Sequence, residues 1–180
     1  MCYNIVGEEK SNKLEDTIYK YAPLLENDYS DTELDNFLNS LKRKTPTLKT
    51  FKEKFKTLGW SNHYDFYKDS KNKDRVKIVL ELLEGYYSGS DFIEEFTLEH
   101  IYPDSKNTAN SQIGNIIPLE RNLNEKCKDK ELIDKLKYYE NSNFKLARNI
   151  SDIYKDNEFD PEIRADQMSE VIYRQILHLS

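Results

Sequence analysis

The chain has 180 residues, of which 37% are hydrophobic and 33% charged, and it includes 13 Tyr and 8 Phe. This length and aromatic content exclude a disordered chain and predict a folded protein with a core of its own. The formal net charge of −6 excludes a protein whose whole surface coats nucleic acid, because such binding depends on many cations that neutralise phosphate.

The two cysteines, Cys2 and Cys127, are too few for a disulfide framework or a four-cysteine zinc site. The sequence also contains no run of about 18 apolar residues, and it begins without the basic and apolar stretches of a secretion signal. We therefore expect no membrane span and a cytoplasmic location.

The N-terminal part of the chain predicts two helices. Residues 10–25 have helical spacing, although Pro23 should limit this helix because proline lacks the backbone N–H that a helix interior needs. Ser30 is a candidate N-cap for the second helix. The apolar residues of that helix follow the i, i+3, i+4, i+7 spacing of one face: Leu34, Phe37, Leu38 and Leu41.

Three further helices are expected before and after the middle of the chain. Residues 48–58 predict a helix that ends at Gly59, and the apolar residues between 76 and 83 predict another that ends at Gly85. Near the C-terminus, Asp160 is a candidate cap and Pro161 takes the first helical position, ahead of an apolar stripe that reaches Ile176. The chain is therefore expected to be mostly helical.

Residues 92–120 break this helical pattern. Residues 96–101 alternate in part and are closed by Pro103, and residues 113–119 form a second apolar run. We predict two short strands joined by a polar loop over residues 104–112 and followed by a helix over residues 119–136. The expected fold is mainly α, of the α+β type: helical residues 1–90 precede residues 91–180, which contain a small strand–loop–strand–helix unit and C-terminal helices.

Polar side chains in this unit could hydrolyse a phosphodiester bond. That reaction needs a base to activate water and a cation to neutralise charge on the phosphoryl oxygens. A neutral His100 can accept a proton near pH 7, while the Glu99 carboxylate and an asparagine amide oxygen are hard ligands that suit Mg²⁺ or Mn²⁺. Asn115 lies fifteen positions after His100, and Asn124 lies twenty-four positions after it.

Local geometry leaves two questions open. Neighbouring residues of a regular strand point to opposite faces, so Glu99 and His100 can face one cation only if the strand ends or bends there. Pro103 is consistent with an early end. Asn122 and Asn124 lie about 200° apart around a helix, so one of them alone should reach the site, and the pattern does not choose between them.

Each of these residues also has a purely structural interpretation. A Glu–His pair is commonly a surface pair, Asn115 beside Gly114 could form a turn, and Asn124 could be a polar residue near a helix start. His63 follows Trp60 closely and is expected to pack in an aromatic cluster.

DNA contacts of an acidic protein must be local, and two basic segments could provide them. Residues 41–56 contain seven Lys or Arg residues against the single acid Glu53, and residues 121–137 contain six against four. The simplest interpretation is that both segments are solvated helix faces. The candidate phosphate contacts are Lys42, Arg43, Lys44, Lys49, Lys52, Lys56 and Arg121.

The residues FTLEHIYPDS (96–105) and IGNIIPLERNLNEK (113–126) resemble the C-terminal nuclease domain of GmrSD-type modification-dependent restriction enzymes. The family pattern is a Glu-His-Ile-x-Pro start, a Gly-Asn-Leu strand and a Leu-Asn helix start. The stretches VKIVLELLEGYY and IRADQMSEVIYRQIL are similar to flanking helices of that family, so the resemblance covers most of the chain. It implies a metal-dependent HNH (ββα-metal) endonuclease that cleaves DNA in restriction or antiviral defence.

By this resemblance His100 is the general base, Glu99 and Asn124 are ligands of Mg²⁺ or Mn²⁺, and Asn115 orients the histidine and its loop. Many related sites have Asp where Glu99 stands, which bears on ligand geometry. Family members carry an N-terminal nucleotide-hydrolysing sensor domain that these residues lack, so we expect such a domain or subunit as a partner beside DNA. The alternative is a non-catalytic helical DNA-binding or protein-interaction subunit with a vestigial motif.

Overall fold

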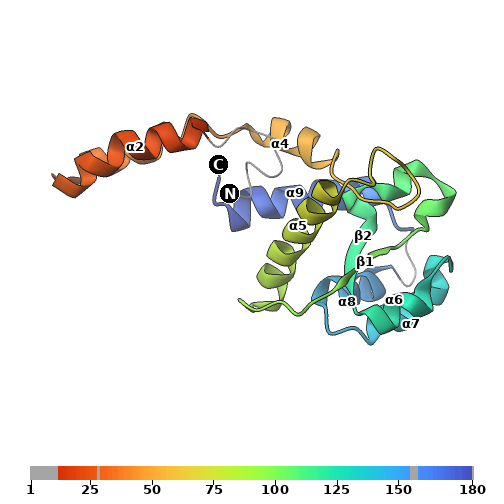
Figure 1. Cartoon of the computed structure of the whole chain (residues 1–180). Helices are drawn as coiled ribbons and strands as arrows, with labels where there is room; N and C mark the ends of the chain where they lie inside the picture. Colours follow the sequence, from red (N-terminus) through yellow and green to blue (C-terminus); the bar gives the residue numbers. More distant parts are fainter. Residues whose placement is uncertain (1–11, 28, 155–157, 180) are drawn as a thin grey trace.

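The computed structural model describes residues 12–27, 29–154 and 158–179. A pair of N-terminal helices projects from a body in which helices surround two short strands (Figure 1). In the described ranges no helix is both long and apolar enough to cross a membrane.

The elements confirm the predicted mainly α, α+β fold. In chain order they are α2 (Asn12–Asn27), α3 (Asp31–Lys42), α4 (Leu48–Phe55), α5 (Ser70–Ser88), β1 (Thr97–His100), the 3₁₀ turns η1 (Asp104–Lys106), η2 (Thr108–Ser111) and η3 (Ile113–Asn115), β2 (Ile116–Leu119), α6 (Arg121–Cys127), α7 (Leu132–Glu140), α8 (Lys145–Ile153), α9 (Pro161–Glu170) and the π-helix η4 (Val171–Ile176).

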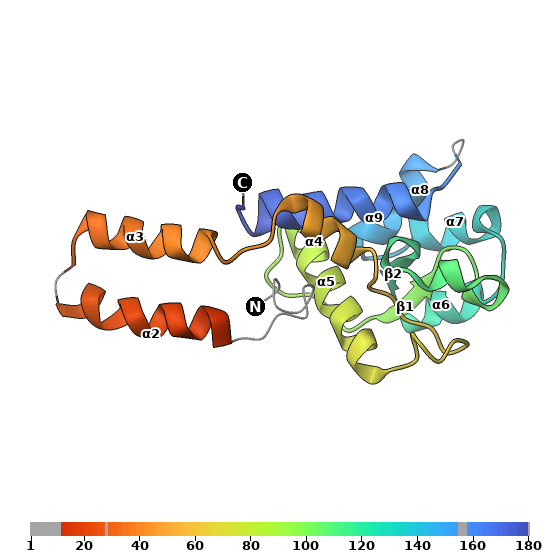
Figure 2. The same cartoon turned by 90° about the horizontal axis from the view of Figure 1, so that it is seen from above.

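Helices α2 and α3 form a hairpin that lies apart from the body (Figure 2). The Ser30 hydroxyl accepts a hydrogen bond from the Glu33 N–H, which is the predicted cap of α3. Tyr21 and Phe37 join the two helices, with ring centroids 5.5 Å apart. The expectation that Pro23 limits α2 was wrong, because a proline removes one helical hydrogen bond and packing against α3 offsets that loss.

The two predicted strands are present and form an antiparallel pair in which Thr97 faces Leu119 and His100 faces Ile116. Each strand has four residues, so β1 ends at His100. The connecting loop folds into the three 3₁₀ turns. The order strand, loop, strand, helix is therefore as predicted.

Three helix boundaries differ from the prediction. Helix α4 ends at Phe55, before the expected residue 58. Helix α5 continues through Gly85 and ends at Gly89, whose φ of 69° supplies the left-handed conformation that stops a helix. The helix expected over residues 119–136 is instead two helices, α6 and α7, because the chain leaves the helical conformation at Lys128. No glycine or proline marks that break in the sequence.

One buried apolar cluster joins residues from both halves of the chain. It includes Phe51 and Phe55 of α4, Val79 and Leu83 of α5, Ile116 and Ile117 of β2, Ala147 and Ile150 of α8, and Ile172 of η4. The core thus holds the helices against the strand pair that carries the predicted site. The division of the chain at residue 90 stays a prediction.

Candidate active site

A cleft of about 210 Å³ lies beside the end of β1. One wall comes from the segment after α4, another from β1 and the turn that follows it, and a third from α6 and its C-terminal turn. The cleft is lined by Trp60, Asn62, His63, Leu98, Glu99, His100, Pro103, Asp104, Asn124, Lys128 and Asp129. Larger hollows exist elsewhere on the surface, but none of them is lined by a histidine.

The His100 imidazole is held by Trp60. Its Nε2 lies 2.8 Å from the Trp60 carbonyl oxygen, and the indole stacks on the imidazole at 5.9 Å with an interplanar angle of 16°. Because a carbonyl can only accept a hydrogen bond, Nε2 carries the proton and Nδ1 keeps its lone pair. Burial lowers the pKa of His100, while the Asp104 carboxylate opposes that shift, so the imidazole is suited to act as a neutral base.

The segment that carries Trp60 is fastened to the loop between the strands. Trp60 N–H donates to the Ser111 carbonyl at 2.9 Å, and Ile113 N–H donates to the Leu58 carbonyl at 2.8 Å. Glycine is required at position 59, between Leu58 and Trp60, because a Cβ there would lie 2.3 Å from the Ser111 carbonyl oxygen. A segment far outside the strand–loop–strand–helix unit thus completes the site, and no local sequence pattern marks it.

Asn115 is fully buried and organises the loop after β1. Its Oδ1 accepts from Tyr102 N–H at 2.9 Å, and its Nδ2 donates to the carbonyls of Tyr102 and Asn110, each at 2.7 Å. Arg164 of α9 donates to the carbonyls of Gly114 and Ile116 on either side. Asn115 therefore braces the loop from behind and does not line the cleft.

Asn124 rather than Asn122 reaches the cleft. Its Nδ2 donates to the Thr97 hydroxyl at 2.9 Å and to the Leu98 carbonyl at 3.0 Å, which fixes the orientation of the amide. Within the described chain, Oδ1 makes no hydrogen bond and is free to act as a ligand. Asn122 is exposed on the other flank of α6.

Glu99 points toward α7, the opposite direction from His100, as the alternation of a strand requires. Its Oε1 accepts from Lys135 Nζ at 2.7 Å and from the Tyr139 hydroxyl at 2.9 Å, and Lys135 also donates to the His100 carbonyl at 2.6 Å. The side chains of Lys135 and Glu99 are 1% and 5% exposed. Burial raises the pKa of Glu99, and the Lys135 ammonium opposes that shift.

The oxygen atoms of Glu99 and Asn124 are ligands of the kind that suits a strongly hydrated divalent cation. Lys135 and Tyr139 engage Oε1 of Glu99, and no described residue donates a hydrogen bond to Oε2. Glu99 and Asn124 could therefore offer two hard oxygen atoms, and Mg²⁺ commonly takes one or two protein ligands and keeps several waters. In the described ranges no group of three or more His, Cys, Asp or Glu side chains is placed to hold a metal ion.

Two cleft residues, Asp104 and His63, were not predicted as site residues. Asp104 Oδ2 accepts from the Ser61 hydroxyl at 2.5 Å, and its Oδ1 lies 3.7 Å from His100 Nδ1 and 3.9 Å from His63 Nε2. The expectation that His63 packs in an aromatic cluster was wrong, because its side chain is 54% exposed at the cleft. The position of Asp104 directly after the Glu-His-Ile-x-Pro start was the available signal.

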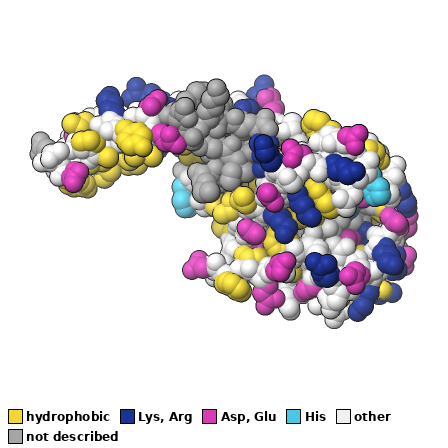
Figure 3. All heavy atoms as spheres, in the orientation of Figure 1, with side chains coloured by type: hydrophobic (Ala, Val, Ile, Leu, Met, Phe, Trp, Pro, Cys, Tyr) yellow, Lys and Arg dark blue, Asp and Glu magenta, His cyan; other side chains and the backbone are white. Residues whose placement is uncertain are grey.

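None of the seven candidate phosphate contacts lines the cleft. Two of them are engaged with α9: Lys52 of α4 pairs with Glu170, and Lys56, the C-cap residue of α4, pairs with Asp166, each at 3.1 Å. Basic and acidic side chains are interspersed on the face drawn in Figure 3, which shows no continuous basic stripe. The role of these residues in DNA binding stays a prediction.

The family model for the C-terminal domain of GmrSD restriction endonucleases matches residues 31–171. The chain belongs to this family. The matched span contains every residue that lines the cleft, whereas α2 lies outside it. No curated protein and no solved structure matches the chain significantly.

Proposed function

We propose that this GmrSD-family domain is a metal-dependent HNH endonuclease that hydrolyses DNA phosphodiester bonds as the nuclease module of a restriction or antiviral defence system. Family membership supports the restriction-nuclease part of this proposal. One observation carries the chemistry: the Trp60 carbonyl fixes the His100 tautomer at a cleft that Glu99 and Asn124 also line. Mg²⁺ or Mn²⁺ is the proposed cofactor.

His100 is the proposed general base. Its Nδ1 accepts a proton from a water molecule, and the resulting hydroxide attacks the phosphorus of a DNA phosphate held in the cleft. The bond from phosphorus to the leaving sugar oxygen breaks, and that oxygen takes a proton from solvent. The Trp60 carbonyl then stabilises the imidazolium through Nε2, which keeps its hydrogen bond throughout.

The other site residues bind or orient. Glu99 and Asn124 would hold the cation, which when bound neutralises charge on the phosphoryl oxygens. Asn115 keeps the loop after β1 in place, and Lys135 opposes the rise in the Glu99 pKa that burial causes. The proposed partners are DNA and a nucleotide-hydrolysing sensor domain or subunit.

A non-catalytic DNA-binding or interaction subunit is the second candidate. The buried Lys135–Glu99 ion pair favours it, because an ammonium already neutralises the carboxylate that would hold the cation. Titration of Mn²⁺ by calorimetry separates the two candidates. A nuclease site binds one ion with an affinity that falls in Asn124→Ala, and a vestigial site shows no binding that depends on Asn124.

Cleavage of plasmid DNA with Mg²⁺ or Mn²⁺, in the presence of the sensor partner, tests the proposed activity. We expect nicked DNA from the native protein and a rate at least about 100-fold lower from His100→Ala, because general-base catalysis contributes that much or more. His178→Ala is the matched control, since this exposed histidine lies outside the cleft. Equal cleavage by His100→Ala and the native protein would refute the proposal.

A further inference from the structure

The turn between α6 and α7 has an unusual backbone conformation at Lys128. Its φ is 43° and its ψ is −135°, a combination that glycine adopts easily and that other residues rarely adopt. A non-glycine residue in such a conformation costs folding free energy, and residues of this kind cluster at functional sites. The structure therefore keeps a lysine where a glycine would be less strained.

The surroundings place this turn at the cleft. The Lys128 N–H donates to the carbonyl of Asn124 at 3.2 Å, so the strained residue follows the proposed ligand by one helical turn. Ser105 donates to the carboxylate of Asp129 at 3.1 Å, which ties the turn to the segment that carries Asp104. Lys128 and Asp129 both line the cleft.

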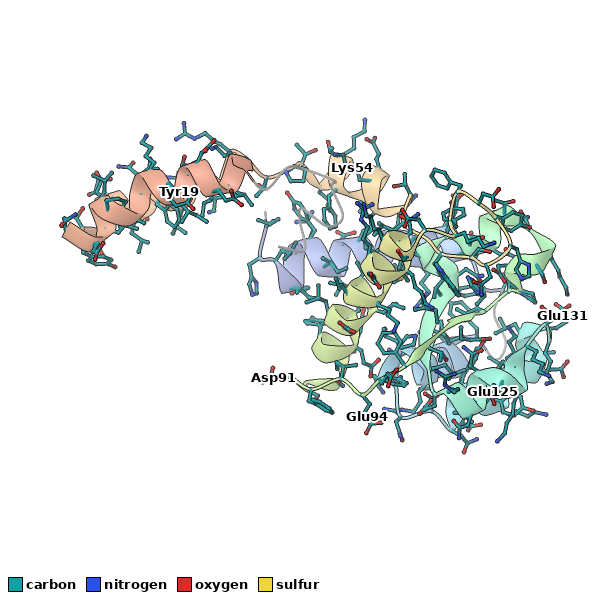
Figure 4. All side chains as sticks on the ribbon, in the orientation of Figure 1. Tyr19, Lys54, Asp91, Glu94, Glu125 and Glu131 are labelled. Carbon is teal, nitrogen blue, oxygen red and sulfur yellow. The ribbon has the colours of Figure 1, made fainter. Side chains whose placement is uncertain are left out.

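Among the residues that line the cleft, Lys128 is the one lysine or arginine. Nearby lysines are engaged: Lys106 pairs with Glu131 at the outer end of the turn, and Lys135 pairs with Glu99 in the interior (Figure 4 labels Glu131). In the described part of the chain Lys128 has no ion pair within 4.0 Å, and its side chain is exposed. Lys128 therefore borders the cleft, and its ammonium has no ion-pair partner among the described residues.

We propose that the Lys128 ammonium binds a non-bridging oxygen of the DNA phosphate in this cleft. The inference rests on the proposed function, and it explains how an acidic protein holds a polyanion beside Glu99, Asp104 and Asp129. Glycine would relax the turn but would supply no cation, so the strain is retained for the phosphate contact. A lysine that stabilised the fold would instead have an acidic partner.

The test compares Lys128→Gly with the native residue in the full chain, with both proteins carrying His100→Ala so that duplex DNA stays intact with Mg²⁺. Lys128→Gly should raise the thermal unfolding midpoint by about 2–4 °C, because strain is relieved. It should also weaken DNA binding about 5- to 10-fold and lower the slope of log affinity against log salt by about 0.9, the value of one lost phosphate contact.

Two matched variants separate charge from conformation. Lys128→Arg keeps the cation and should bind DNA like the native protein, whereas Lys126→Ala removes an exposed charge of α6 that does not line the cleft and should keep the salt slope. If Lys128→Gly binds DNA with the native affinity and the native salt slope, the proposal is overturned. A lower thermal unfolding midpoint in Lys128→Gly would also overturn it, because it would show that the lysine is structural. DNA that is bound through Lys128 but never cut by the active protein would instead refute the nuclease function alone.

Discussion

At the residue scale, the chemistry of the site depends on which atoms are already engaged. His100 has one nitrogen bound to a backbone carbonyl and the other directed to the cleft, which is the arrangement that a base requires. Asn124 has its amide nitrogen engaged by β1, which leaves its oxygen available as a ligand. Glu99 lines the cleft as a residue, and Oε1 of its carboxylate is engaged by Lys135 and Tyr139 on the side of α7.

The candidate site residues were named from the sequence, but not all of their contacts could be. Glu99, His100 and Asn124 meet at one cleft because the motif follows the short-range order of strand, loop, strand and helix. Lys135, Tyr139 and Trp60 could not be predicted, because the tertiary packing of α7 and of the segment after α4 brings them to the site. Nothing in their local pattern marks them as site residues.

Lys135→Met tests the buried ion pair. Without the ammonium, the Glu99 charge has no counter-ion in the interior, so we expect the free energy of unfolding to fall by roughly 3–5 kcal/mol. Denaturation by urea measures this loss. Lys137→Met, an exposed lysine on the same helix, should change stability by less than about 0.5 kcal/mol.

The double variant Lys135→Met with Glu99→Gln should recover part of the lost stability, because it removes both charges of the pair. Equal stability of the two single lysine variants would show that the pair contributes nothing.

At the element scale, the fold was predictable where local signals agree with packing. Apolar spacing and terminal residues located α3, α4 and α9, partial alternation located β1, and an apolar run located β2. The end of α5 was predicted at the wrong glycine. Gly85 lies inside the helix, and Gly89 ends it. The break between α6 and α7 could not be predicted, because it occurs at Lys128, a lysine in a backbone conformation that glycine usually adopts.

Gly59→Ala tests how the segment after α4 completes the site. The new methyl group would collide with the Ser111 carbonyl and push the Trp60 carbonyl away from His100. We expect a loss of about 1–3 kcal/mol of stability from overpacking, together with a lower cleavage rate at temperatures where the protein is folded. Circular dichroism melting and plasmid nicking measure the two effects.

Gly89→Ala is the control for Gly59→Ala. It meets no atom within 4 Å but is strained by its positive φ, and it lies away from the cleft. Its stability should fall by about 1 kcal/mol while its cleavage rate stays native. If both glycine variants cut DNA at the native rate, the Trp60 carbonyl does not orient the base.

At the scale of the whole molecule, an acidic chain must contact DNA through a few cations. Helix α4 and the end of α3 carry basic residues of two kinds: exposed lysines such as Lys42 and Lys49, and lysines paired with α9 such as Lys52 and Lys56. A paired lysine must exchange a carboxylate for a phosphate before it binds DNA. Its contribution to affinity is therefore smaller.

This difference predicts unequal effects of two double variants on DNA binding. Lys42→Ala with Lys49→Ala should lower the salt slope by about 1.8 if both contact phosphate, and Lys52→Ala with Lys56→Ala should lower it by less. Affinity should fall similarly for different DNA sequences, and a saturating DNA concentration should restore the cleavage rate. An unchanged slope in both double variants would show that α4 is an ordinary solvated helix.

The proposed roles of Asn124 as a metal ligand and His100 as the general base are tested most directly by one titration. It measures the rate of plasmid nicking against Mn²⁺ concentration for Asn124→Ala and His100→Ala. Loss of a ligand weakens ion binding, so we expect raised Mn²⁺ to restore much of the rate of Asn124→Ala. Loss of the base removes the proton acceptor, so His100→Ala should stay inactive at every Mn²⁺ concentration. Equal losses that Mn²⁺ restores in neither variant would contradict the roles assigned to His100 and Asn124.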